Sequence, residues 1–199
     1  VNLDQLSIAQ MIDLMMSEDR KIPDAILAEK AKIEKAIKLI TRAFKTGGRL
    51  FYAGAGSSGR LGVLDASECP PTFRTPPELV QGIIAGGQCA LWKAVEGAED
   101  DALAGEEAIQ FNTVTSKDVV VGIAASGRTP FVWGALLEAK KRGAKTILLC
   151  FNPHLVVAAK HRPHILIAPA VGTEVLTGST RLKAGTATKL ILNMLTTLS

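Results

Sequence analysis

Apolar residues recur at helical spacing through the first 46 residues of the chain. In a first stretch Leu6, Ile8, Met11, Ile12 and Met15 lie at helical spacing. A second stretch, 26–44, repeats the pattern, and the pair Gly47-Gly48 ends it. Because Pro23 lies between the stretches, we expect two helices over 1–46. The first is expected to be an arm that packs on something other than this core, with a partner subunit as a candidate.

After residue 47, short apolar runs of β type alternate with helical stretches. The runs fall near residues 49–54, 79–84, 118–124, 145–150 and 164–168. Such alternation predicts a parallel sheet with helices on both faces. Hydrophobic residues make up 47% of the chain and aromatic residues only 5%, which is typical of a parallel sheet covered on both faces. We therefore assign 47–199 to one α/β domain.

Two of the predicted strands run into the same signal. The segments 54–60 (GAGSSGR) and 124–130 (AASGRTP) both place Ser-Gly-Arg where a helix begins. Free backbone N–H groups, hydroxyls and the positive end of a helix then face one point, which favours an anion. In parallel sheets, ligands bind at the carboxyl ends of the strands, where both loops fall. We predict one sugar-phosphate-sized ligand held by both loops, through Gly56, Ser57, Ser58, Ser126, Gly127 and Thr129.

Two other interpretations fit parts of these loops. Gly54, Gly56 and Gly59 have the spacing of a dinucleotide-binding turn. The next strand, however, ends in Ala85-Gly86-Gly87, without the acidic residue that would hold a ribose, so this interpretation is disfavoured. The second interpretation makes the serines of both loops ordinary helix caps, and the repetition of the signal argues against it.

Charge and cysteine content narrow the class of protein. The net charge of +4 is modest, and the basic run 140–142 closes a predicted helix, where cations are favoured, so nucleic acid is not implied. Cys69, Cys89 and Cys150 are odd in number and lack metal-ligand spacing, which favours a reducing compartment. We expect a cytoplasmic protein without a membrane span, a signal peptide or a metal site. Since the chain stops inside an apolar helical pattern, we also expect the native protein to continue beyond Ser199.

Two acidic segments follow the first loop. Segment 65–73 (DASECPPTF) carries Glu68 before a Pro-Pro pair, which predicts a rigid turn around this carboxylate. Two carboxylates in different environments can act as acid and base. Spacing alone favours a solvated helix start for the second group, which consists of Glu96, Glu99, Asp100 and Asp101.

A third cluster, 172–186, combines glycines and hydroxyls with basic residues. Lys183 and Ser179 can contact a bound anion there. An equally good interpretation is that Ser179 or Thr180 merely caps the last helix.

These segments together resemble a known family. Residues 54–62, 65–73, 94–100, 122–130 and 177–187 look in order like segments of the bacterial N-acetylmuramic acid 6-phosphate etherases. The run DASECPP is the specific part, because isomerases and sugar-phosphate sensors share the Ser-Gly-Arg loops. The resemblance implies a sugar isomerase (SIS) domain, which is a three-layer α/β/α sandwich with a central parallel sheet, and a homodimer. Two departures stand out: position 57 is Ser where the family commonly has Thr, and the family's further C-terminal helical segment is not in this chain.

The resemblance also implies a chemistry. It makes the protein a carbon–oxygen lyase of amino sugar catabolism and peptidoglycan recycling, which releases D-lactate and N-acetylglucosamine 6-phosphate by elimination and hydration. By motif match Glu99 removes the C2 proton and Glu68 protonates the departing lactyl oxygen, with no cofactor. Two alternatives remain: a non-enzymatic sugar-phosphate-binding regulator, and an aldose-ketose isomerase of the same fold.

Overall fold

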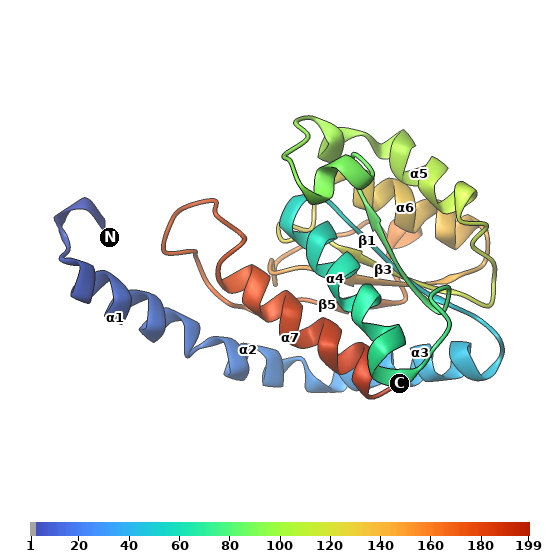
Figure 1. Cartoon of the computed structure of the whole chain (residues 1–199), viewed down its shortest axis with the longest axis horizontal. Helices are drawn as coiled ribbons and strands as arrows, with labels where there is room; N and C mark the ends of the chain where they lie inside the picture. Colours follow the sequence, from blue (N-terminus) through green and yellow to red (C-terminus); the bar gives the residue numbers. More distant parts are fainter. Residues whose placement is uncertain (1–2) are drawn as a thin grey trace.

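A parallel five-stranded sheet forms the centre of the computed structural model, which describes residues 3–199 (Figure 1). The strands are β1 (Leu50–Gly54), β2 (Val80–Ile84), β3 (Val119–Ile123), β4 (Lys145–Leu149) and β5 (Ile165–Ile167), arranged in the order β2-β1-β3-β4-β5. All five predicted strands are confirmed. Gly54 at the end of β1 pairs with Ile123 at the end of β3, so the two Ser-Gly-Arg loops leave the sheet side by side.

Helices cover both faces of this sheet and give it two cores. On one face α3 (Lys30–Lys45), α4 (Gly56–Phe73) and α7 (Lys183–Thr197) pack on alternate strand residues such as Leu50 and Tyr52. On the other face α5 (Ala102–Phe111) and α6 (Pro130–Lys141) pack on the residues between them, such as Phe51 and Ala53. Every residue of β1 and β3 is buried, as expected for central parallel strands. The predicted α/β architecture is therefore confirmed.

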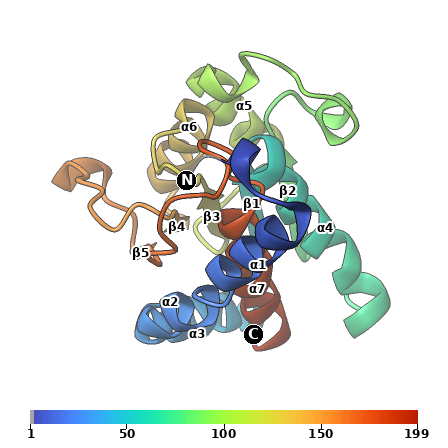
Figure 2. The ribbon, with the colours of Figure 1, turned by 90° about the vertical axis from the view of Figure 1, so that its left-hand side faces the viewer.

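The N-terminal segment holds three α-helices, so the prediction of two helices separated by Pro23 is wrong. They are α1 (Ile8–Asp19), α2 (Ile22–Ala28) and α3, preceded by a short 3-10 turn, Leu3–Gln5; residues 1–2 of the predicted arm lie outside the described residues. Pro23 lies in the first turn of α2, where a missing N–H costs nothing. The breaks fall instead around Arg20 and Glu29. Helix α1 extends away from the body as an arm (Figure 1), lies in front of the body in the view of Figure 2, and has no buried residue.

Helix α4 corrects a second expectation, because segment 65–73 is helical and not a rigid turn. Pro70 and Pro71 occupy the last turn, so they remove only the hydrogen bonds to the carbonyls of Ala66 and Ser67. Burial of Ala66 and Cys69 holds this turn on the sheet. The helix then ends at Arg74, whose φ of 57° is left-handed.

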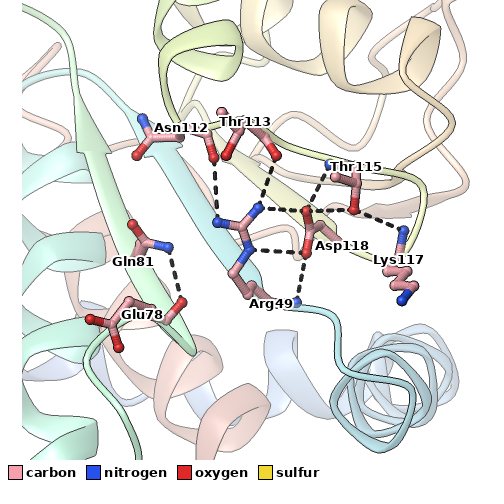
Figure 3. A network of polar contacts seen from close by, with 8 residues as sticks. All are labelled: Arg49, Glu78, Gln81, Asn112, Thr113, Thr115, Lys117 and Asp118. Atoms are coloured by element: carbon pink, nitrogen blue, oxygen red, sulfur yellow. Dashed lines mark hydrogen bonds and ion pairs between the residues drawn. The ribbon is translucent and has the colours of Figure 1, made fainter.

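An ion pair between a buried carboxylate and a partly exposed guanidinium ties the amino ends of the central strands together (Figure 3). Asp118, only 2% exposed, precedes β3; it accepts hydrogen bonds from the Arg49 backbone N–H at 2.8 Å and guanidinium at 3.0 Å, and from the Thr115 N–H at 2.7 Å. Burial alone would raise the pKa of Asp118, but these donors outweigh it and hold the pKa below its ordinary value. Arg49 also donates to the carbonyls of Asn112 and Thr113.

The remaining short elements lie in loops. They are the 3-10 turns η2 (Gln88–Leu91), η3 (Ala98–Asp100) and η4 (Ala159–His161). Within residues 3–199, none of the helices combines the length and the apolar character that a membrane crossing requires.

Candidate active site at the carboxyl edge of the sheet

The first Ser-Gly-Arg loop turns β1 directly into α4. The helix begins at Gly56 (φ 53°) after Ala55, and no side chain caps its first turn. Ser57 and Ser58 lie inside this turn, so the interpretation that they are N-caps is wrong. A Cβ on Gly54 would stand 2.7 Å from the backbone nitrogen of Gly59, which shows how closely strand end and helix approach. The uncapped N–H groups of the turn remain free for an anion.

The second loop repeats this construction between β3 and α6. The Ser126 hydroxyl is exposed and accepts a hydrogen bond from the Arg128 N–H at 3.2 Å, within the loop and not within the helix. Gly127 has a φ of 73°, and its carbonyl accepts from the indole of Trp133 at 2.8 Å, which anchors the loop to α6. Thr129 is the N-cap residue of α6 but makes no side-chain cap bond. The capping interpretation of Ser126 is therefore wrong as well.

The start of α7 is capped by a residue that sequence reasoning missed. The Glu174 carboxylate accepts hydrogen bonds from the N–H groups of Lys183 and Ala184, both at 3.0 Å. Neither Ser179 nor Thr180 caps the helix, so that alternative is wrong. A capping side chain normally directly precedes its helix; this one comes from nine positions upstream, where no local pattern marks it.

Lys183, a predicted contact of the bound anion, is engaged with the N-terminal arm. Its side chain is 1% exposed, and its ammonium lies 2.7 Å from a carboxylate oxygen of Glu18, at the end of α1. Hydrogen bonds from Lys183 and then Lys21 lower the pKa of Glu18 to about 2. This contact joins the arm to the start of α7.

Each of the two loops lines a cavity, and segment 180–189 contributes residues to both cavities. Ser57 lines a cavity of about 430 Å³ together with Arg181 and Lys189. Ser126 lines one of about 290 Å³ together with Arg128 and Thr180. The segment contributes Arg181, Gly185, Thr186 and Lys189 to the first cavity and Thr180 and Ala184 to the second. Segment 180–189 thus adjoins both the first loop and the second loop.

Glu99 lies near the first loop. It belongs to η3 and lines a cavity of about 170 Å³ with Gly56 and Arg60. Arg60, on α4, donates hydrogen bonds to the carbonyls of Leu91 and Lys93 at 3.3 and 3.0 Å, which holds the segment between β2 and η3 against this helix. In the same acidic group, Asp101 caps α5 by accepting from the Ala104 N–H at 2.9 Å, which confirms the helix-start interpretation for that residue.

Glu68 lies elsewhere. It is exposed on α4 and follows Ser57 by 11 positions, which corresponds to about 16 Å along the helix axis. On the buried side of the same helix, Asp65 accepts hydrogen bonds from the Tyr52 hydroxyl and the Asn193 amide, both at 2.9 Å. These bonds fix α4 to β1 and α7, and the sequence pattern did not distinguish Asp65 from its neighbours.

Comparison with known proteins places the chain in a family. The family model described as the glucokinase regulatory protein N-terminal SIS domain matches residues 32–140. Two proteins named N-acetylmuramic acid 6-phosphate etherase, from Pectobacterium atrosepticum and Serratia proteamaculans, are 54% identical over 197 residues, which is 99% of this chain and 64% and 66% of theirs. A protein of that name from Actinobacillus pleuropneumoniae is 53% identical over the whole chain and 65% of its own length. The chain thus spans slightly less than two thirds of these relatives.

Solved structures support the fold. A phosphoheptose isomerase from Francisella tularensis has a TM-score of 0.69 at 19% identity, covering 100% of this chain and 97% of its own. The phosphoheptose isomerase of Neisseria gonorrhoeae also has a TM-score of 0.69, at 15% identity, covering 96% and 97%. The Vibrio vulnificus NanR protein, solved in complex with ManNAc-6P, has a TM-score of 0.57 at 14% identity, covering 96% and 64%. The predicted SIS-type sandwich is confirmed.

Proposed function

This chain belongs to the SIS-domain family of the glucokinase regulatory protein, and on that premise we propose that it binds a sugar phosphate and cleaves the lactyl ether of N-acetylmuramic acid 6-phosphate. The products are N-acetylglucosamine 6-phosphate and D-lactate. The identity of 54% to proteins named for this activity is the observation that carries the proposal. We also propose that the protein is cytoplasmic and acts as a homodimer.

The phosphate is assigned to the two Ser-Gly-Arg loops. Their origin at paired strand ends, the uncapped first turn of α4 and the exposed hydroxyl of Ser126 support this assignment. Candidate contacts are Gly56, Ser57, Ser58, Ser126, Gly127 and Thr129, with Ser179 and Lys183 from the third cluster. Lys183 would have to exchange Glu18 for the ligand, because its ammonium is otherwise occupied.

The reaction is an elimination followed by a hydration. In the open-chain aldehyde the carbonyl acidifies C2, so Glu99 takes the C2 proton and the electron pair forms the C2–C3 double bond. Glu68 donates a proton to the lactyl oxygen as the C3–O bond breaks. Water then adds at C3 and a proton returns to C2. The substrate's own carbonyl stabilises the carbanion, so the proposed route uses no cofactor.

Deuterated water tests the two roles. Glu99→Gln removes the base, which typically contributes 10²- to 10⁴-fold, so exchange of the C2 proton and lactate release should both be lost. Glu68→Gln leaves the base intact, so C2 exchange should persist while lactate release collapses. If Glu68→Gln loses C2 exchange and Glu99→Gln keeps it, the two roles are reversed. If both variants release lactate at the normal rate, neither residue is catalytic and the proposed mechanism is wrong.

A sugar-phosphate-binding regulator is the second candidate, favoured by the description of the matching family model. An isomerase is the third, because solved isomerases share the fold. Incubation with N-acetylmuramic acid 6-phosphate distinguishes all three. The etherase releases lactate, the regulator binds the sugar phosphate without turnover, and the isomerase converts an aldose phosphate to a ketose phosphate without releasing lactate.

A further inference from the structure

A further cavity is lined by the segment that joins β4 to β5. Its volume of about 430 Å³ falls in the range of about 300–1,000 Å³ that is typical of small-molecule sites. The lining comes from the second loop, from α6 and from segment 154–161. In Figure 2 this last segment, coloured orange, projects at the left of the body. Neither Ser126 nor a proposed catalytic glutamate is among the described residues that line the cavity, so the proposed reaction does not account for it.

The lining combines nitrogen donors with apolar side chains. Arg128, His154 and His161 offer N–H groups. Trp133 and the four aliphatic residues that follow His154 provide the apolar area. None of the described residues in this lining has a hydroxyl, an amide or a carboxylate on its side chain. Such a lining can bind an anionic group and an apolar body, but it offers few partners to the hydroxyls of a sugar.

The charge around this cavity favours an anion. Segment 151–164 contains Lys160 and Arg162 but no aspartate or glutamate. Arginine binds a carboxylate through two parallel N–H···O bonds, and imidazole N–H groups can donate to the same oxygens. Inorganic phosphate alone would leave the apolar side uncovered, where Val156 is 94% exposed. The lining therefore fits a carboxylate that is attached to an apolar body.

Contacts with the second loop and with α6 hold the wall of the cavity in place. A Cβ on Gly127 would stand 2.6 Å from a methyl carbon of Leu155, which shows that this side chain packs directly on the loop. The indole N–H of Trp133 donates to the Gly127 carbonyl at 2.8 Å. The Lys140 ammonium, on α6, donates to two carbonyls of segment 160–162 at 3.2 and 3.0 Å. The wall is thus formed without a ligand.

Arg128 belongs to two cavities, this one and the cavity of Ser126. A guanidinium that a carboxylate has neutralised attracts a second anion less strongly. We propose that the cavity is a second binding site, for a small carboxylate with an apolar body, and that a ligand there weakens binding of the sugar phosphate by neutralising Arg128. By linkage the sugar phosphate weakens binding of the carboxylate by the same factor. The site itself is independent of the proposed function, whereas its effect on the sugar phosphate rests on it.

The fluorescence of Trp133 tests the site. The chain has two tryptophans, so Trp92→Phe, at a position that is 82% exposed, leaves Trp133 as the single reporter. Titration with 3-phenylpropionate should give a saturable change in fluorescence. The uncharged 3-phenylpropanol should bind at least tenfold more weakly, because it lacks the charge that the guanidinium binds. No saturable change with 3-phenylpropionate, or equal binding of the alcohol or of inorganic phosphate, would overturn the proposal.

Two variants in the Trp92→Phe background locate the bound probe. His154→Ala/His161→Ala removes two donors from the lining and should raise the Kd of 3-phenylpropionate at least tenfold. Lys160→Ala is the matched control. It removes a full charge next to His161, but its side chain does not line the cavity, so the Kd should change less than twofold. If Lys160→Ala weakens binding as much as the double variant does, general surface attraction explains the probe and the site is wrong. Thermal melting checks that each variant is folded.

Calorimetric titration with N-acetylglucosamine 6-phosphate tests the effect on the proposed phosphate site. Its Kd should rise at least fivefold when 3-phenylpropionate saturates the cavity. In the His154→Ala/His161→Ala variant the same concentration of the probe should leave this Kd unchanged. An unchanged Kd in the wild type would show that the two cavities are independent and would overturn the effect assigned to Arg128. If the sugar phosphate does not bind even without the probe, the proposed function fails, whereas the fluorescence titration still decides the cavity.

Discussion

The polar groups at the amino end of the central sheet are paired with one another, whereas those at the carboxyl end are largely unpaired. At the amino end, Asp118 and Arg49 bind each other and the surrounding backbone, so the buried charges are paired (Figure 3). At the carboxyl end, the first turn of α4 has no side-chain cap and Ser126 is exposed. Groups that are already paired contribute to stability, whereas unpaired donors are available to a ligand. The difference predicts that substitutions at the two ends affect different properties.

Asp118→Ala should have the largest effect on stability. It removes the carboxylate partner of the Arg49 guanidinium, which keeps two backbone carbonyls, and leaves two backbone N–H groups without their acceptor. Breaking a buried pair costs about 3–5 kcal/mol. We expect urea unfolding to show this loss while the folded variant binds the sugar phosphate with unchanged Kd. A matched substitution of an exposed acid, Glu78→Ala, should change little. An equal loss of affinity in Asp118→Ala would contradict the division between the two ends.

Ser126→Ala should weaken ligand binding and leave stability unchanged. A hydrogen bond to a charged group contributes about 1.5–3 kcal/mol, so the Kd for the sugar phosphate should rise roughly ten- to a hundredfold. The free energy of unfolding should hardly change, because the hydroxyl accepts only from the N–H of Arg128 in an exposed loop. Calorimetric titration and urea unfolding of one preparation measure both quantities. An unchanged Kd would show that Ser126 does not contact the phosphate.

Glu174→Ala sharpens the comparison, because Glu174 is a paired group at the carboxyl end. Loss of a helix cap costs about 0.5–2 kcal/mol, which thermal or urea unfolding can detect. The same carboxylate lines the cavity of Ser126 and would repel an anion there, so removing it should also tighten phosphate binding. Glu174→Gln, which keeps an acceptor oxygen and loses the charge, should restore part of the stability and keep the tighter binding. Weaker phosphate binding in both variants would show that Glu174 helps to form the site.

The smallest expected effect is on pH dependence. The folded-state pKa of Asp118 lies below its ordinary value of 3.8, so its ionisation stabilises the fold above about pH 4. That contribution is lost as the pH falls through the lowered pKa. We therefore expect the stability difference between wild type and Asp118→Asn to be constant from pH 5 to 7 and to shrink below pH 4. A difference that persists unchanged to pH 2 would mean that the carboxylate charge is not involved.

The sequence by itself determined the sheet and its two loops, because their signals are local. Apolar runs mark the five strands, and a glycine or serine after a strand marks a turn wherever it occurs. The Pro-Pro pair gave a wrong prediction because it is also a local signal, and proline disfavours a helix interior. Burial of Ala66 and Cys69, which the local sequence does not show, keeps this turn helical.

Tertiary structure alone decided the long-range partners of Glu174 and Lys183. Glu174 reaches a helix that begins nine positions later, and Lys183 pairs with Glu18 from 165 positions away. The separation of Glu68 from Glu99 likewise follows from the length of α4, which no motif states. A charge takes whichever opposite charge or donor the folded chain brings within about 3 Å, and that choice depends on the packing of whole helices, whereas a strand depends mainly on its own apolar residues.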